Sequence, residues 1–156
     1  MYWLVFIILF LFCSIEALSA DTFCKHDQNT FKCVSYVRNY DGDTIVVNIP
    51  NVHPIIGENI SIRIKGIDTP EIKTNDKCER DIALKAWQIV KNILITAHRI
   101  DLENIKRDKY FRIDADVIAD GISLQKIMLK EKLAYPYSHG KTQKIDWCKG
   151  NIQGFM

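Results

Sequence analysis

Two stretches with alternating hydrophobicity, residues 44–49 and 60–67, constrain the fold of this chain most strongly. Apolar side chains occupy every second position in both: Ile45, Val47, Ile49, Ile60, Ile62 and Ile64. This is the period of a half-buried β-strand, because successive side chains of a strand point to opposite faces. The turn pair Asp41-Gly42 precedes the first stretch, and Pro70 follows the second. The sequence therefore predicts two strands, joined by a loop over residues 50–59.

The remaining pattern predicts three more strands and two helices. Residues 31–40, 99–105 and 110–119 are rich in β-branched or alternating apolar side chains. Apolar positions recur every three or four residues over 79–97, as in an amphipathic helix, and Ser123 is a suitable N-cap for a second helix. Five short strands with two helices fit a small barrel of the oligonucleotide-binding type, but the pattern alone leaves other α+β arrangements open.

The N-terminus resembles an export signal. Residues 2–13 form an unbroken apolar run, too short for a comfortable membrane span, and small residues follow at Ala17, Ser19 and Ala20. We therefore expect a signal peptide over residues 1–20, a single domain over 21–156, and an exported, secreted or periplasmic protein with no stable membrane association. No Lys or Arg precedes the apolar run, so an uncleaved membrane anchor is the alternative.

Four cysteines remain after the predicted leader: Cys24, Cys33, Cys78 and Cys148. An even number in an exported protein indicates two disulfides, and the sequence allows three pairings. Pairing Cys24 with Cys33 would close a short loop, while pairing Cys78 with Cys148 would tie the C-terminal tail to the start of a helix. The alternative is a metal site built from Cys24, His26 and Cys33, although its spacing matches no standard zinc pattern.

The two predicted strands at residues 44–49 and 60–67 have charged groups in or beside them that are suited to phosphate chemistry. Asp43 directly precedes the first strand, Asp68 follows the second, and Arg63 lies within the second. Carboxylate oxygens suit a hard cation such as Ca²⁺, and a planar guanidinium can donate two hydrogen bonds to a phosphate. Together they point to chemistry on a phosphate ester. Taken singly, each has a plainer explanation, as a turn-forming aspartate or a solvated arginine.

The order of four motifs resembles the thermonuclease, or staphylococcal nuclease-like, family. They are Asp-Gly-Asp-Thr at 41–44, Ile-Arg-Ile-Lys-Gly-Ile-Asp-Thr-Pro-Glu at 62–71, Arg-Asp-Lys-Tyr-Phe-Arg at 107–112 and Leu-Ala-Tyr-Pro-Tyr at 133–137. The resemblance implies an α+β fold, with a five-stranded OB-fold-type β-barrel and two or three helices. It also implies a Ca²⁺-dependent endonuclease that hydrolyses DNA and RNA, leaving 3′-phosphate and 5′-hydroxyl ends.

The same resemblance assigns the metal and the catalytic groups. Asp43 and Asp68 would bind Ca²⁺ through their carboxylates and Thr69 through its backbone carbonyl, with Asp41 in a supporting position. Arg63 and Arg112 would bind the phosphate and stabilise the charge of the transition state. Glu71 would act as the general base that activates water.

Further residues would bind the substrate. Lys109 and Tyr110 resemble the pair that contacts a terminal phosphate, and Tyr135 and Tyr137 resemble aromatic residues that line the base site. One position departs from the usual pattern, because Phe111 replaces the common glycine before Arg112. The basic residues of this segment cluster locally, whereas the net charge of +2 does not by itself indicate a nucleic-acid partner.

Two other functions remain open from the sequence. The first is a catalytically silent nucleic-acid-binding module on the same barrel, which would bind without cleaving. The second is an exported structural or adhesion domain that is stabilised by disulfides. It would show no Ca²⁺ dependence and no salt-sensitive affinity for nucleic acid. The presence of all the metal and arginine positions favours the enzyme, and we expect it to be a monomer.

Overall fold

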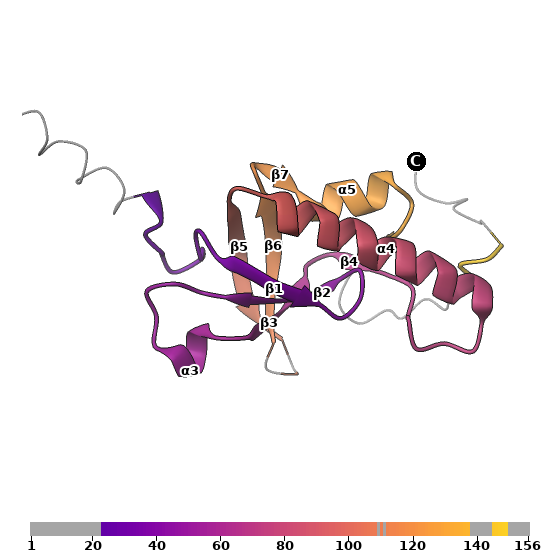
Figure 1. Cartoon of the computed structure of the whole chain (residues 1–156), viewed down its shortest axis with the longest axis horizontal. Helices are drawn as coiled ribbons and strands as arrows, with labels where there is room; N and C mark the ends of the chain where they lie inside the picture. Colours follow the sequence, from indigo (N-terminus) through magenta and orange to yellow (C-terminus); the bar gives the residue numbers. More distant parts are fainter. Residues whose placement is uncertain (1–22, 109, 111, 138–144, 150–156) are drawn as a thin grey trace, which may run out of the picture.

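The computed structural model describes residues 23–108, 110, 112–137 and 145–149, which form two sheets and three helices (Figure 1). The larger sheet contains β1 (Ser35–Asn39), β2 (Thr44–Asn48), β3 (Ile60–Ile64), β5 (Ile100–Arg107), β6 (Ile113–Ala119) and β7 (Ile122–Ser123). The smaller sheet pairs β4 (Ile67–Asp68) with β8 (Tyr135–Pro136). The helices are α3 (Pro54–Gly57), α4 (Lys77–Thr96) and α5 (Leu124–Lys130).

The five predicted strands form the main path of the larger sheet, in the order β1-β2-β3-β6-β5. Neighbours along this path are antiparallel except β3 and β6, which are parallel, and the two-residue β7 is added beside β6. The segment just before β1 bonds to β5, where the amides of Phe31 and Val34 donate to the carbonyls of Leu102 and Ile100 at 2.9 Å. Both ends of the strand order are thus brought together, and the predicted α+β class with an OB-type arrangement is confirmed.

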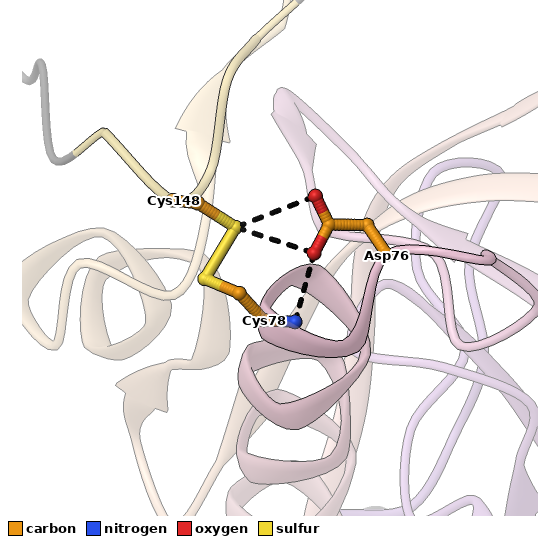
Figure 2. A group of neighbouring side chains, drawn as sticks. All are labelled: Asp76, Cys78 and Cys148. Atoms are coloured by element: carbon orange, nitrogen blue, oxygen red, sulfur yellow. Dashed lines mark hydrogen bonds between the residues drawn. A yellow bond between two sulfur atoms is a disulfide. The ribbon is translucent and has the colours of Figure 1, made fainter.

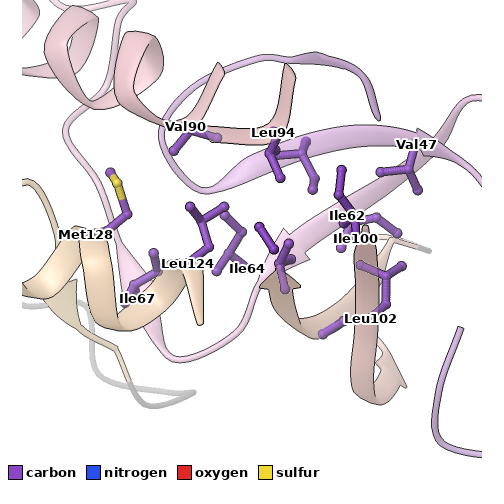
Figure 3. Close-up of a cluster of buried hydrophobic side chains, with 14 of the residues drawn as sticks. Val47, Ile62, Ile64, Ile67, Val90, Leu94, Ile100, Leu102, Leu124 and Met128 are labelled. Atoms are coloured by element: carbon purple, nitrogen blue, oxygen red, sulfur yellow. The ribbon is translucent and has the colours of Figure 1, made fainter. Parts of the chain in front are cut away.

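The core is built from the alternating positions of the strands and one stripe of each longer helix (Figure 3). Ile62 and Ile64 of β3 are fully buried, and the α4 residues Val90 and Leu94 belong to the same buried cluster. Full burial of such a side chain contributes roughly 1.5–3 kcal/mol. The helix α4 begins where Asp76 caps it, because the Asp76 carboxylate accepts a 2.8 Å hydrogen bond from the Cys78 amide.

The structure corrects the predicted strand over residues 60–67. This segment is two strands, because Gly66 adopts a φ of +75° and turns the chain between β3 and β4. As a result Asp68 lies on the smaller sheet, where it pairs with Tyr135 of β8. The loop over 50–59 also contains the short helix α3, which projects away from α4 and α5 in Figure 1.

Both disulfides join the pairs considered in the sequence. Cys24 bonds to Cys33 and Cys78 bonds to Cys148, with Cα separations of 5.5 and 6.0 Å. The alternative zinc site is therefore wrong, since two of its three ligands are in a disulfide. The carboxylate of Asp76 lies beside the second disulfide (Figure 2). The sulfurs of Cys78 and Cys148 are bonded to each other, so Asp76, Cys78 and Cys148 do not form a metal site.

The described helices do not include one that is both long and apolar enough to cross a membrane. The predicted leader over residues 1–20 lies outside the described residues.

Candidate active site

The loop that carries Asp41 and Asp43 is held by its own carboxylate. An Asp41 Oδ1 oxygen accepts hydrogen bonds from the amides of Asp43 at 3.0 Å and Thr44 at 2.6 Å. Gly42 packs so closely that an added Cβ would lie 2.9 Å from Ala86 of α4. Asp41 therefore supports the loop, while a glycine lets the loop approach the helix.

Asn39, which the sequence analysis did not single out, ties the same loop to α4. Its side-chain amide donates to the carbonyl of Asp41 at 2.9 Å and to that of Trp87 at 3.0 Å. The Trp87 indole donates in return to the Asn39 carbonyl at 3.0 Å. Nothing in the local sequence of Asn39 indicates a partner 48 residues away in α4.

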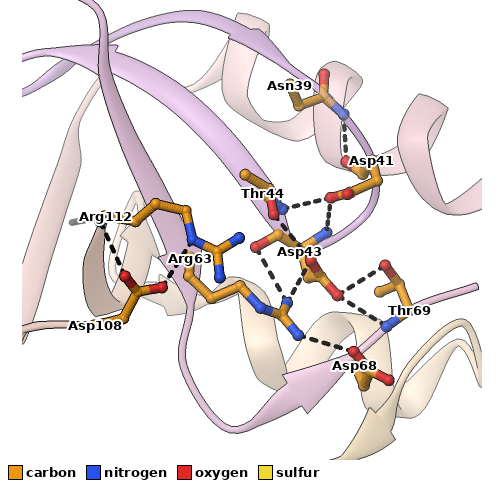
Figure 4. A network of polar contacts seen from close by, with 9 residues as sticks. All are labelled: Asn39, Asp41, Asp43, Thr44, Arg63, Asp68, Thr69, Asp108 and Arg112. Atoms are coloured by element: carbon orange, nitrogen blue, oxygen red, sulfur yellow. Dashed lines mark hydrogen bonds and ion pairs between the residues drawn. The ribbon is translucent and has the colours of Figure 1, made fainter. Parts of the chain in front are cut away.

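Asp43 is the buried centre of the polar network in Figure 4, with 5% of its surface exposed. Its Oδ2 oxygen accepts from the amide and the hydroxyl of Thr69, at 2.9 and 3.0 Å. Its Oδ1 oxygen accepts from the Thr44 hydroxyl at 3.1 Å and forms an ion pair with Nη1 of Arg63. Both oxygens of this carboxylate are therefore engaged by polar groups.

Arg63 brings the two predicted metal-binding carboxylates together. It extends from β3, opposite Thr44 in the β2–β3 register, and its Nη2 lies 2.9 Å from Oδ1 of Asp68. The Arg63 side chain is 14% exposed, whereas that of Asp68 is 41% exposed. Arg63 thus bridges a buried carboxylate in the turn before β2 and a half-exposed carboxylate in β4.

Negative charge accumulates at this end of the pocket. Burial raises the pKa of Asp43 to about 7, and the charge of Asp41 adds to that rise, while the Arg63 charge opposes it. Burial also raises the pKa of Glu71, with further contributions from the charges of Asp41 and Asp68. One guanidinium therefore does not fully compensate the surrounding carboxylates.

These residues fit a hard divalent cation. Carboxylate oxygens of Asp43 and Asp68, with a backbone oxygen such as that of Thr69, are the ligand types that Ca²⁺ and Mg²⁺ prefer. The raised pKa of Asp43 indicates that additional positive charge would stabilise its ionised form. A cation bound here would compete with Arg63 for oxygens that Arg63 contacts in the structure.

The second arginine is held by Asp108, another residue that the sequence analysis did not assign. An Asp108 oxygen accepts from Nε of Arg112 at 2.8 Å, and the other accepts from the amides of Tyr110 and Arg112 at 2.7 and 3.0 Å. Partial burial opposes ionisation of Asp108, but these hydrogen bonds outweigh it and lower the pKa. Lys109 and Phe111, between these residues, lie outside the described residues.

One pocket of about 860 Å³ contains most of the predicted site. Its lining includes Asp41, Asp43, Arg63, Asp68, Glu71, Tyr110, Arg112 and Tyr137. Asp114 of β6 also lines it, although the sequence analysis did not consider that residue. Tyr135 is not part of this lining; its ring packs against Trp147, with the centroids 4.6 Å apart.

Comparisons with known proteins agree with this arrangement. Residues 61–148, more than half of the chain, match the family model described as staphylococcal nuclease homologue. The chain is 38% identical over 114 residues to endonuclease YncB of Bacillus subtilis (strain 168), covering 70% of this chain and 51% of that protein. It is 36% identical over 126 residues to the SPbeta prophage-derived endonuclease YokF of the same organism, covering 77% of this chain and 40% of that protein. The chain therefore spans about half of these relatives or less, and it belongs to the staphylococcal nuclease homologue family.

Proposed function

We propose that this protein is an exported, Ca²⁺-dependent endonuclease that hydrolyses phosphodiester bonds in DNA and RNA. The observation that carries the proposal is the convergence of Arg63, Arg112 and the carboxylates of Asp43, Asp68 and Glu71 on one pocket. These groups come from distant parts of the chain, and cations beside a carboxylate cluster suit hydrolysis of a phosphate diester. The two relatives named as endonucleases support the same reaction class.

The two arginines would bind the substrate phosphate. Arg63 and Arg112 line the same pocket, and each guanidinium is oriented by a carboxylate rather than by solvent. Planar guanidiniums placed in advance stabilise the extra negative charge that develops on phosphorus in the transition state. Tyr110 and Tyr137 line the same pocket and can contact the sugar or the base.

Asp43, Asp68 and the Thr69 carbonyl would hold the cation. When bound, a divalent cation supplies positive charge to the phosphate oxygens and to a water molecule. Glu71 would accept the proton of the attacking water. Its raised pKa suits this role, because a base with a pKa closer to neutrality accepts a proton more readily at the working pH.

Attack by water in line with the leaving 5′ oxygen would give a 3′-phosphate and a 5′-hydroxyl. Export is supported by the apolar run at residues 2–13 and by the two disulfides, which persist in oxidising compartments.

The test is cleavage of labelled single-stranded DNA, duplex DNA and RNA by the oxidised protein, with Ca²⁺, with Mg²⁺ or with a chelator. Arg63→Ala should abolish Ca²⁺-dependent cleavage. Arg99→Ala is the matched control, because Arg99 is also paired with an aspartate but lies outside the pocket. The ends of the products are identified by whether a kinase labels them without prior phosphatase treatment.

The alternatives predict different results in the same assay. Salt-sensitive binding without cleavage would identify a silent binding module. A folded protein that neither binds nor cleaves nucleic acid would overturn both nucleic-acid functions and leave a structural domain.

A further inference from the structure

The second disulfide anchors a short C-terminal segment, residues 145–149, beside the start of α4 (Figure 2). Within this segment Trp147 is partly buried, and its ring lies against Tyr135 of β8, with the ring centroids 4.6 Å apart. Cys148 is the next residue, and its bond to Cys78 attaches the segment to the first turn of α4. The segment thus joins α4 to β8. The residues that line the pocket include neither Trp147 nor the disulfide.

The strand β8 connects this segment to one of the predicted metal ligands. Asp68 of β4 is paired with Tyr135 of β8, so the two side chains lie on the same face of the small sheet. One more hydrogen bond extends the pairing, from the Tyr137 amide to the Gly66 carbonyl at 2.9 Å. A pair of two-residue strands is marginal unless other groups pack against it. Trp147 is such a group, because it packs on the ring that neighbours Asp68.

Asp68 depends on such support more than Asp43 does. Asp43 is buried, and two threonine side chains and Arg63 contact its oxygens. The Asp68 side chain is 41% exposed, and its carboxylate is held by Arg63. A cation that binds this carboxylate would compete with the arginine. The position of Asp68 then depends on the backbone of β4, which the buried Ile67 holds on the core side and β8 holds at its edge.

We infer that Trp147 is a positioning residue for Asp68 and that the Cys78–Cys148 disulfide holds it in place. The ring keeps β8 against β4, so the Asp68 carboxylate stays close to that of Asp43 when a cation binds. Groups behind the direct ligands of a metal commonly change its affinity by about 10–100-fold when they are removed. The inference rests on the proposed cation site, and it makes the C-terminal segment a part of what that site needs.

The experiment measures the Ca²⁺ affinity of the oxidised full chain in two ways, one of which does not involve cleavage. The first is the rise in melting temperature as Ca²⁺ is added, because a ligand that binds only the folded state stabilises it. The second is the Ca²⁺ concentration that gives half-maximal cleavage of single-stranded DNA. Trp147→Ala should weaken both on the order of tenfold, the lower end of the range for a supporting group. At saturating Ca²⁺, kcat and KM for DNA should stay close to the wild-type values.

Two further variants separate the ring from the covalent bond. Trp147→Phe keeps an aromatic ring against Tyr135 and should restore most of the Ca²⁺ affinity. A protein with Cys78→Ser and Cys148→Ser should lose affinity in the same way as Trp147→Ala. Combining all three changes should add little further loss, because the bond acts through the ring and the two effects are coupled.

The first disulfide supplies the matched control. Changing Cys24 and Cys33 to serine also removes a disulfide, but neither cysteine lines the pocket or contacts Trp147 through a bond or a ring. This variant should bind Ca²⁺ as tightly as the wild-type protein, even where its melting temperature in chelator is lower. Circular dichroism shows whether each variant is folded at the assay temperature, so a general loss of stability is distinguished from a loss of Ca²⁺ affinity.

Several results would overturn the inference. If Trp147→Ala binds Ca²⁺ as tightly as the wild-type protein, the inference is wrong and the nuclease function is untouched. An equal loss of affinity in the Cys24 and Cys33 control would show that any loss of stability has this effect. If Trp147→Ala does not fold, the comparison of the two disulfide variants decides.

Failure of the proposed function gives a different pattern. A wild-type protein that cleaves nothing overturns the proposed nuclease, while the melting-temperature titration still tests the role of Trp147. A wild-type protein that responds to Ca²⁺ in neither measurement overturns the proposed cation site and this inference together.

Discussion

The two arginines of the pocket are held in contrasting ways. Arg63 contacts two carboxylates, Asp43 before β2 and Asp68 in β4, which are also the predicted metal ligands. Arg112 contacts Asp108, a carboxylate four residues earlier in the chain that also accepts two backbone amides of the same loop. The first pair joins distant segments, while the second is local.

The carboxylates that pair with the two arginines also differ in their pKa shifts. The pKa of Asp43 is raised by burial, so Arg63 leaves this carboxylate incompletely compensated. The pKa of Asp108 is lowered, because its hydrogen bonds outweigh the effect of burial. We expect the orientation of Arg112 to be fixed before substrate binds. The contacts of Arg63, by contrast, depend on whether a cation occupies the carboxylates that it bridges.

Removing either arginine should have the largest effect on activity. The two variants should also distinguish the ion pairs of Arg63 from the ion pair of Arg112. Arg63→Ala and Arg112→Ala should each lower kcat on the order of 10²-fold or more, because each removes a donor to the transition state. In chelator, Arg63→Ala should also lower the melting temperature, since it leaves the buried Asp43 without its cation. Ca²⁺ should restore much of the lost melting temperature of Arg63→Ala. It should not restore the melting temperature of Arg112→Ala in the same way. If Ca²⁺ changed the melting temperatures of both variants equally, the ion pairs of Arg63 and Arg112 would not differ in their dependence on a cation.

Asp108→Asn should have a smaller effect, of about tenfold in kcat. The arginine remains, but it loses the charged acceptor that fixes its Nε, which is worth about as much as one charge-assisted hydrogen bond. Asp120→Asn is a suitable control, because Asp120 also accepts two backbone amides, those of His98 and Arg99, but lies outside the pocket. A normal rate in Asp108→Asn would mean that Arg112 does not need its partner.

The contrast also explains which parts could be predicted from the sequence. The pattern of apolar residues predicts that Ile62, Ile64 and one stripe of α4 are buried. This follows because side-chain direction repeats every two residues in a strand and every 3.6 residues in a helix. The contacts of Asn39 with Trp87, and the placement of Asp114 beside Arg63, join residues far apart in the chain. No local signal in the sequence indicates these contacts.

The placement of two tyrosines was likewise not predictable from the local sequence. The family motif assigns Tyr135 and Tyr137 together to the base site, and their spacing of two gives no reason to separate them. In the structure Tyr137 lines the pocket, while Tyr135 packs on Trp147. Trp147 is next to Cys148, which the second disulfide joins to Cys78 of α4, and the sequence left that pairing open among three.

Each arginine also has a tyrosine nearby, and the two should differ in importance. Tyr137 is half-buried beside Arg63, whereas Tyr110, near Arg112, is 65% exposed. Tyr137→Leu should raise KM about fivefold, the low end of the range for loss of one stacked base. Tyr110→Leu should raise it less. Tyr135→Leu serves as the comparison, because it should lower the melting temperature without changing KM; an increase in KM there would place Tyr135 in the substrate path.

The smallest expected effect is the acid dependence of the Arg112 pair. Because the folded pKa of Asp108 lies below its ordinary value of 3.8, the ionised carboxylate stabilises the fold above that value. This stability, on the order of 1 kcal/mol, should be lost as pH falls through the folded pKa. The measurement is the difference in melting temperature between wild type and Asp108→Asn, from pH 7 to pH 2.5. The difference isolates Asp108, because both proteins retain Asp43, whose raised pKa changes stability in the opposite direction and cancels in the difference. A difference that persists at the acid end would mean that shape, rather than charge, holds the loop around Arg112.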